Sequence, residues 1–258
     1  MMQCIMKNKT VKATAYGLIA ALFWITVWSA ASAIIGLDLI LPGPLKVARE
    51  ILKLFISKKF WITSLFTIIR IFSGFSAGAV IGATLAILTH YSRIVNTILS
   101  PFMTVVRATP VASFIMVLWL IVGSDLVPVF ITALMVAPIV WQNVKEGFNS
   151  INPELSEVCD AYELPFNSRL KFLIAPTLKN YIIPGFITSS SLAWKSGIAA
   201  EIIAYTKNSI GREIINAKNF FESAEMLAWT AIIILFSLVF EYLLRRVGRR
   251  FSKNDAKA

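Results

Sequence analysis

Charged residues are scarce in this chain: Asp, Glu, Lys and Arg together make up 15% of its 258 residues, whereas apolar residues make up 57%. Soluble domains usually carry about 25% charged residues. The apolar residues also come in long blocks rather than in alternating patterns, which is typical of membrane-spanning helices. The composition therefore excludes an ordinary soluble domain.

Residues that bind metals or ATP are equally rare. The chain has one histidine, His90, and no cluster of histidines, cysteines and carboxylates, so we expect no metal site. It contains no G-x-x-x-x-G-K-[S/T] loop, so we expect no bound ATP and no other cofactor in this chain. Cys4 and Cys159 both lie in segments that we place in the cytoplasm, where disulfides are rare. No reactive group of side chains indicates an enzyme.

The long apolar blocks predict an all-α polytopic membrane protein, with about six transmembrane helices in a single domain over residues 1–258. The expected spans are residues 15–35, 61–89, 95–122, 126–144, 179–203 and 224–244. Ala31-Ser-Ala33 resembles a signal-peptidase site, but the apolar block is long for a signal peptide and continues past it. Pro101 and Pro110 are expected to interrupt the third span.

Positive charge indicates the orientation in the membrane. Basic residues precede the first span and follow the last: Lys7, Lys9, Lys12, Arg245, Arg246, Arg249 and Arg250. Because cytoplasmic segments are enriched in Lys and Arg, we expect both termini in the cytoplasm and the chain in a bacterial cell membrane. The net charge of +11 then reflects anchoring at the lipid bilayer rather than nucleic-acid binding.

The sequence also predicts an amphipathic helix near the outer side of the membrane and a close-packing face on the second span. After the break at Leu41-Pro-Gly-Pro44, apolar residues at helical spacing face basic ones, which predicts an amphipathic helix lying in the outer interface. In the second span, Gly74, Gly78 and Gly82 share one face and predict close packing against another helix. Arg70 on the same span either snorkels to the headgroups or faces the protein interior.

The longest polar interruption, residues 150–177, predicts two short amphipathic helices. Asn152 can cap the first, which starts at Pro153, and Leu164-Pro165 ends it; Asn167 or Ser168 can cap the second. An apolar face of Leu155, Val158, Ala161 and Tyr162 lies beside an acidic stripe of Glu154, Glu157, Asp160 and Glu163. A docking element and an ordinary surface loop both fit this pattern.

Polar side chains at membrane depth form a second candidate site. They are Arg107 beside Pro110 in the third span, and Thr188, Ser191, Trp194, Lys195 and Glu201 in the fifth. Such groups are costly in lipid unless they face protein or water, so they predict a polar path through the membrane. The alternative is structural: Lys195 pairs with an acid such as Glu201, and Arg107 binds carbonyls freed by Pro110.

The polar interruption also carries a family resemblance. Glu157, Glu163 and, after nine residues, Leu173-Ile-Ala-Pro176 resemble the EAA loop of ABC importer permeases. That family pattern reads Glu-Ala-Ala, three residues, Gly, nine residues, Ile, any residue, Leu, Pro. Glu163 stands where the family has a glycine with positive φ, so we expect Pro165 to break the helix instead.

Further motifs are similar to the nitrate/sulfonate/taurine-type branch of these permeases, among them Leu41-Pro-Gly-Pro44, Arg107-Ala-Thr-Pro110 and Ala199-Ala-Glu201. The resemblance implies a channel-forming permease subunit that moves a small anionic or zwitterionic solute into the cell. Its implied partners are a second permease copy, two cytoplasmic ATPase subunits that bind ATP, and an extracytoplasmic binding protein. The implied coupling residues are Glu154, Glu157, Asp160, Ala161, Tyr162, Glu163, Phe166 and Pro176. A secondary transporter working without an ATPase is the alternative, although its usual internal repeats are not evident.

Overall fold

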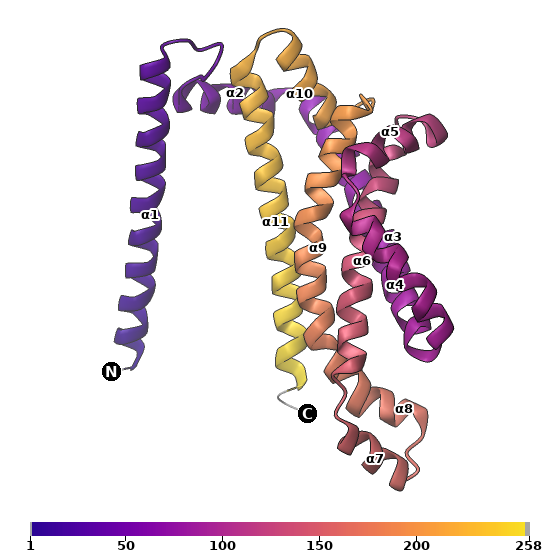
Figure 1. The fold of residues 1–258 in the computed structure, drawn as a ribbon. Helices are drawn as coiled ribbons and strands as arrows, with labels where there is room; N and C mark the ends of the chain where they lie inside the picture. The colour runs from indigo at the N-terminus through magenta and orange to yellow at the C-terminus, as the bar shows by residue number, and fades with distance from the viewer. Residues whose placement is uncertain (1, 256–258) are drawn as a thin grey trace. The chain divides into compact units, whose positions relative to one another are not determined.

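The computed structural model describes the backbone of residues 2–255 and the side chains of residues 16–249. All regular structure in this part of the chain is helical (Figure 1). The elements are α1 (Met2–Ile35), α2 (Pro44–Ile56), α3 (Lys58–Tyr91), α4 (Arg93–Ala108), α5 (Val111–Val122), α6 (Val127–Asn149), α7 (Pro153–Ala161), α8 (Phe166–Arg169), the π-helical turn η1 (Leu170–Ile174), α9 (Ala175–Ile203), α10 (Ile210–Asn219) and α11 (Ser223–Asp255). The predicted all-α polytopic fold is confirmed.

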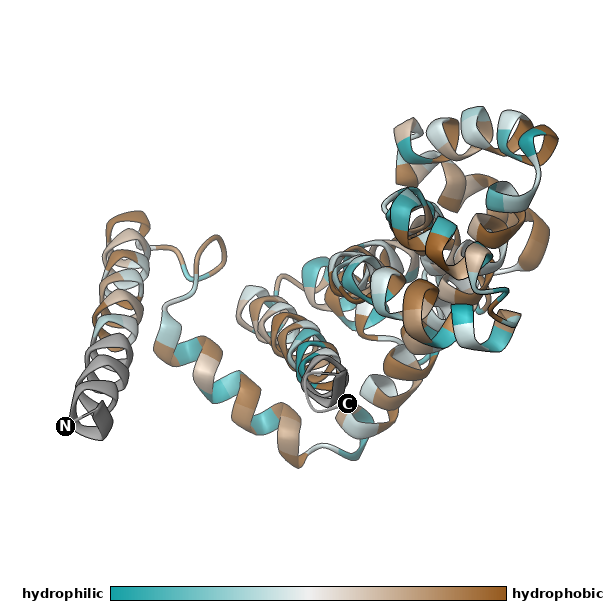
Figure 2. Ribbon diagram, turned by 90° about the horizontal axis from the view of Figure 1, so that it is seen from below, coloured by the Kyte–Doolittle hydropathy of each residue, from teal (hydrophilic) through white to brown (hydrophobic). Residues whose placement is uncertain are grey.

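The chain forms two compact units, one of Met1–Phe60 with Glu213–Ile232 and one of Trp61–Arg212 with Ile233–Ala258. In the first unit, α2 begins at Pro44 after Gly43, and Figure 2 shows polar and apolar residues alternating around this helix, which follows α1. The Phe60 ring stacks on Trp229 with centroids 5.6 Å apart. Lys59 and Glu213 form an ion pair of 2.6 Å.

The apolar part of α1 is mostly exposed along its described length. No residue of its most apolar stretch, within residues 16–35, is buried. Its polar anchors are at one end, where Trp28 Nε1 donates to the Pro42 carbonyl at 3.1 Å and Ser32 Oγ donates to the Leu41 carbonyl at 2.9 Å. An apolar helix of this kind is stable only in lipid or against another protein.

In the second unit, α3 lies directly against α6 along its three glycines. A Cβ atom built on Gly74 would lie 2.6 Å from the Val129 carbonyl oxygen, and one on Gly78 would lie 2.6 Å from that of Ala133. At Gly82 the corresponding distance, to the Ala137 oxygen, is 2.4 Å. The helices can approach this closely only because the residues have no side chain.

The core of the second unit is built from α3, α6, α9 and α11. Trp194 on α9 is buried among aromatic rings of α11, with centroid distances of 6.2 Å to Phe236 and 6.4 Å to Phe240. Phe75 on α3 meets Phe240 edge to face at 5.3 Å. These contacts fix which face of α9 points into the protein.

The third expected span, over residues 95–122, is interrupted, as its prolines predicted. This stretch forms α4 and α5, which meet at an angle of 102°. Of the two prolines expected to interrupt it, Pro110 stands at the break and Pro101 lies inside α4. Pro110 has no N–H and fixes its own φ, so α4 ends before it and a new helix starts after it in another direction.

Among the described residues, four helices are long and apolar enough to cross a membrane, or five if α4 and α5 form one broken span. These four include residues of α1, α3, α6 and α11. The fifth expected span is α9, a helix of 29 residues that contains too many polar groups to count among them. At about 1.5 Å per residue it is nevertheless longer than the hydrocarbon core of a bilayer.

Candidate functional site

The helices α7 and α8 form a hairpin that extends beyond the ends of α6 and α9 (Figure 1). Asn152 caps α7, because its side-chain oxygen accepts a hydrogen bond of 2.8 Å from the Glu154 N–H. Pro153 then takes the first helical position, where its missing N–H has no consequence. The predicted start of this helix is confirmed.

The predicted break at Pro165 is wrong, because the turn is made two residues earlier. Glu163 adopts a left-handed conformation with φ of +47°. The N–H of Leu164 donates to the Cys159 carbonyl and the N–H of Glu163 donates to the Asp160 carbonyl, both at 3.0 Å. These are the two bonds of a Schellman motif, in which glycine is the usual residue at the left-handed position.

The second short helix starts earlier than expected. It begins at Phe166 directly after Pro165, so Asn167 and Ser168 lie inside it rather than capping it. Arg169 on α8 pairs with Asp160 on α7 and holds the hairpin together. The hydrogen bond to the Asp160 carboxylate raises the pKa of Arg169.

The hairpin presents several apolar side chains on its surface. The exposed fraction is 50% for Val158, 77% for Tyr162 and 61% for Phe166. Ala161 and the four acidic residues of the stripe, Glu154, Glu157, Asp160 and Glu163, are exposed as well. An apolar face of this kind with a charged border is typical of a protein interaction surface.

The hairpin is joined to α9 without a flexible link. η1 continues from α8 and passes directly into α9, where Pro176 is the second residue. Leu173 anchors this junction because its side chain is buried. A displacement of the hairpin must therefore move the end of α9.

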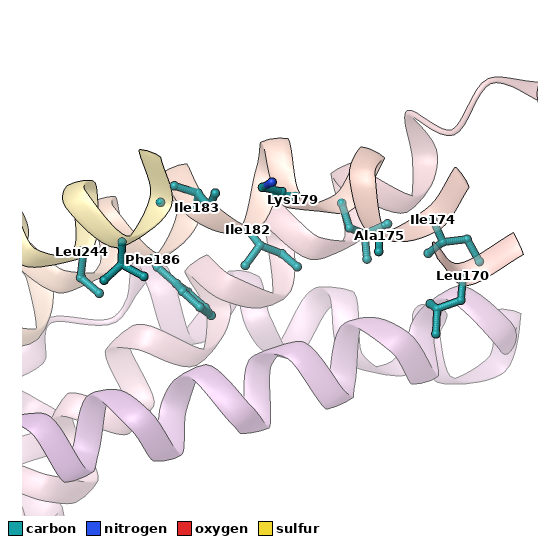
Figure 3. Close-up of a pocket in the computed structure, with 11 residues that line it drawn as sticks. Leu170, Ile174, Ala175, Lys179, Ile182, Ile183, Phe186 and Leu244 are labelled. Carbon is teal, nitrogen blue, oxygen red and sulfur yellow. The ribbon is translucent and has the colours of Figure 1, made fainter. Parts of the chain in front are cut away.

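A groove of about 410 Å³ lies along this junction, between η1, α9 and α11 (Figure 3). Leu170 and Ile174 line it at the hairpin end, and Phe186 and Leu244 line it deeper in the bundle. Its lining is almost entirely apolar, and Lys179 is the one charged residue in it.

One face of α9 is polar and open, and it contains three of the predicted path residues. Thr188 and Lys195 are exposed and Ser191 is half-buried. Within the described part of the chain no ion pair to Lys195 is present, and Glu201 instead has Arg70 as its nearest cation. Pairing of Lys195 with Glu201, the structural alternative, is therefore wrong.

Two of the other predicted path residues lie elsewhere. Trp194 is 4% exposed and belongs to the aromatic core, and Glu201 is fully buried. Both share the helix with Lys195 but point to other sides, because each successive residue of a helix is rotated by about 100° around its axis. In this subunit neither side chain reaches an open face.

Glu201 lies in a polar cluster between α3 and the start of α10. Its Oε2 accepts hydrogen bonds from Thr67 Oγ1 at 3.1 Å and from the Gly211 N–H at 3.2 Å. Arg70 lies 3.9 Å from its other oxygen and also donates to the carbonyls of Lys207 and Asn208. Arg70 therefore faces the protein and does not snorkel.

Arg107 is exposed and does not bind the carbonyls that Pro110 frees. It donates to the side-chain oxygen of Gln142 on α6, and Gln142 in turn donates to Glu146 at 2.9 Å. Pro110 itself is exposed at the break. Sequence reasoning missed Gln142 and Thr67, although both are hydrogen-bonding side chains inside otherwise apolar blocks.

A family model described as the binding-protein-dependent transport system inner membrane component matches residues 78–253, which is more than half of the chain. The chain belongs to this family. Two relatives are 24% identical to it: an aliphatic sulfonates transport permease protein of Bacillus subtilis (strain 168) and the taurine transport system permease protein of Escherichia coli (strain K12).

These alignments cover most of each permease. The first spans 217 residues, 83% of this chain and 78% of the relative, and the second spans 232 residues, 87% and 84%. A crystal structure of an amino acid ABC transporter with histidines shares the fold, with a TM-score of 0.59 and 18% identity over 72% of this chain and 91% of that one.

The predicted membership of the nitrate/sulfonate/taurine-type branch is thereby confirmed, and so is the predicted function as the permease subunit of an ABC importer. The chain is a multi-pass membrane protein and not an enzyme. The alternative of a secondary transporter is wrong, since the family works with an ATPase and a substrate-binding protein.

Proposed function

We propose that this permease imports a small anionic or zwitterionic solute as a homodimer, driven by two ATPase subunits that bind the ATP and supplied by an extracytoplasmic binding protein. Residues 1–258 then act as one transmembrane domain, with the hairpin at residues 150–177 as its coupling element. The single observation that carries this proposal is the exposed apolar face of the hairpin, joined through η1 to the polar helix α9.

The hairpin is suited to receive force from an ATPase. Tyr162 and Phe166 offer rigid aromatic anchors, and the exposed carboxylate of Glu157 lies at their border. Interface energy concentrates in such aromatic residues, while charges at the rim set orientation and the rate of association. Because the link to α9 is helical, a movement at Phe166 is passed to Pro176 rather than absorbed in a loop.

The open face of α9 supports an anionic solute. Lys195 offers a positive charge there, and the hydroxyls of Thr188 and Ser191 continue the face in the direction of the hairpin. The two relatives are named for sulfonates and for taurine, which carry a sulfonate group. Two copies facing one another would enclose a path that a single exposed helix face cannot.

The orientation follows from the hairpin. If the hairpin meets ATPase subunits, it lies in the cytoplasm, and the basic end of α11 with Arg245, Arg246 and Arg249 lies at the same end of the second unit (Figure 1). The basic residues before α1 agree with a cytoplasmic N-terminus.

Replacing Glu157 with Lys tests the coupling role. We expect the assembled transporter to keep its basal ATPase activity but to lose uptake of radiolabelled taurine into proteoliposomes, because a reversed charge at the rim misaligns the contact. Lys53→Glu reverses an exposed charge on α2, outside the hairpin, and serves as a control with nearly normal uptake. Wild-type uptake by Glu157→Lys would remove the hairpin from the coupling contact.

A further inference from the structure

The α9–α10 loop, residues 204–209, is bound by one arginine at the end of α9 opposite the hairpin (Figure 1). Arg70 on α3 donates from Nη1 to the Asn208 carbonyl at 3.2 Å and from Nη2 to the Lys207 carbonyl at 3.0 Å. All of these residues lie in the second unit. One guanidinium group therefore ties the loop after α9 to α3.

The same two nitrogens of Arg70 each have a carboxylate nearby that they do not bind. Nη1 lies 3.9 Å from Oε1 of Glu201, and Nη2 lies 3.9 Å from Oδ1 of Asp125 in the turn between α5 and α6. Both distances are too long for a hydrogen bond. Because an N–H bond to a carboxylate is stronger than one to a neutral carbonyl, the loop holds Arg70 away from its two strongest acceptors.

The Glu201 oxygen near Arg70 is left without a hydrogen bond. Oε2 accepts from Thr67 and Gly211, but Oε1 is buried and accepts no hydrogen bond from the described residues. An unsatisfied buried acceptor raises the free energy of the folded state, and native proteins rarely keep one. A short movement of Arg70 toward Oε1 would satisfy this oxygen at the expense of the bonds to the loop.

The loop is also held in an unfavourable backbone conformation. Tyr205 and Asn208 are left-handed, with φ of +51° and +46°. Asn tolerates this region, but a bulky residue such as Tyr is strained there. Thr206 Oγ1 fixes the loop a second time, by donating to the Ser124 carbonyl at 2.8 Å. Release of the loop would break these attachments but relieve the strain at Tyr205 and free Arg70 for Glu201.

We propose that the α9–α10 loop is an outer latch with two states, which Arg70 exchanges between two sets of acceptors. In the closed state, seen here, Arg70 binds the loop carbonyls. In the open state it pairs with Glu201, and the loop releases the end of α9 from α3 and from the turn between α5 and α6. This inference rests on the proposed import function, in which that end of α9 lies outside the cell. Opening then admits solute from outside to the face that carries Lys195.

Cysteine labelling of the assembled transporter tests the latch directly. Ser209 is buried in the loop, so Ser209→Cys, in a chain whose Cys4 and Cys159 are replaced by Ser, reports release of the loop to a membrane-impermeant maleimide. We compare proteoliposomes without ATP and after trapping with ATP, orthovanadate and the binding protein, and expect about tenfold faster labelling after trapping. Lys207→Cys is the matched control: its side chain is already exposed and its carbonyl still accepts from Arg70, so both states label it equally.

Substitutions of the charged pair are expected to act in opposite directions. Arg70→Gln removes the donors that hold the loop, so labelling of Ser209→Cys without ATP rises about tenfold. Glu201→Gln keeps the bonds from Thr67 and Gly211 but removes the charge that draws Arg70 away, so labelling after trapping falls toward the rate without ATP. A purely structural cluster would loosen in both variants. Faster labelling without ATP in Glu201→Gln, or equal labelling of Ser209→Cys in the two states, would overturn the latch.

Taurine uptake by the same proteoliposomes separates this inference from the proposed function. Intact uptake together with labelling of Ser209→Cys that does not depend on ATP leaves the proposed function and removes the latch. Labelling that depends on ATP without any taurine uptake removes the proposed solute class and leaves the latch.

Discussion

Replacing Gly78 with Ala probes the contact between α3 and α6. The new Cβ atom would lie 2.6 Å from the Ala133 carbonyl oxygen, 2.9 Å from the Ala133 Cα and 2.9 Å from the Val136 Cβ. Two of these three atoms belong to the backbone of α6 and cannot rotate away. The helices must therefore move apart, which loosens their contact on either side.

The expected change in the free energy of unfolding is the difference between two effects. Overpacking of a tight contact costs about 1–3 kcal/mol. The intrinsic preference of a helix for Ala over Gly returns about 1 kcal/mol. We therefore expect Gly78→Ala to lower the free energy of unfolding by about 1 kcal/mol.

Gly17 on α1 is the matched control, since a Cβ atom there would meet nothing within 4 Å. Gly17→Ala adds only the helix preference and is expected to stabilise slightly. Thermal unfolding of the purified protein in one detergent measures both variants. The reasoning is refuted if Gly78→Ala raises the midpoint as Gly17→Ala does.

Two further predictions concern the hairpin and the buried carboxylate. Glu163→Gly should stabilise the hairpin by about 1 kcal/mol, since the left-handed conformation costs an L-residue about 1–2 kcal/mol; slower amide exchange at Leu164 would report it, and unchanged exchange would contradict it. Glu201→Ala should destabilise the protein by about 3–5 kcal/mol, because it leaves Arg70 without its nearest buried counter-charge. Glu201→Gln keeps the shape of the side chain, so it should lower the thermal unfolding midpoint less than Glu201→Ala does. Equal midpoints for both variants would argue against the polar cluster.

Local signals in the sequence predicted much of the coupling hairpin. Asn152 and Pro153 place the start of α7 correctly, because capping depends on the side chain and backbone of adjacent residues. The turn was missed for a similar local reason. Glu163 has no intrinsic preference for positive φ, and only the two closing hydrogen bonds of the Schellman motif hold it there.

The membrane path was less predictable. The sequence identified the polar residues of α9 but could not tell its faces apart, since Trp194, Lys195 and Glu201 are all unusual at membrane depth. Packing of Phe236 and Phe240 against Trp194 directs that side of the helix inward and leaves Lys195 outside. Gly248 on α11 likewise gives no sign in the sequence of its partner, and only the tertiary structure shows that it lies against Ile183 on α9.

The sequence by itself determined that this chain crosses a membrane, that α7 starts at Pro153 and that α3 carries a close-packing face. These properties depend on the length of apolar blocks, on proline and glycine chemistry and on helical periodicity, all of which act within one segment. The tertiary structure alone decided that Glu201 meets Thr67 and Arg70, that α4 and α5 diverge at 102°, and that Trp194 points into the aromatic core. These depend on contacts between segments far apart in the chain, whose register no local pattern specifies.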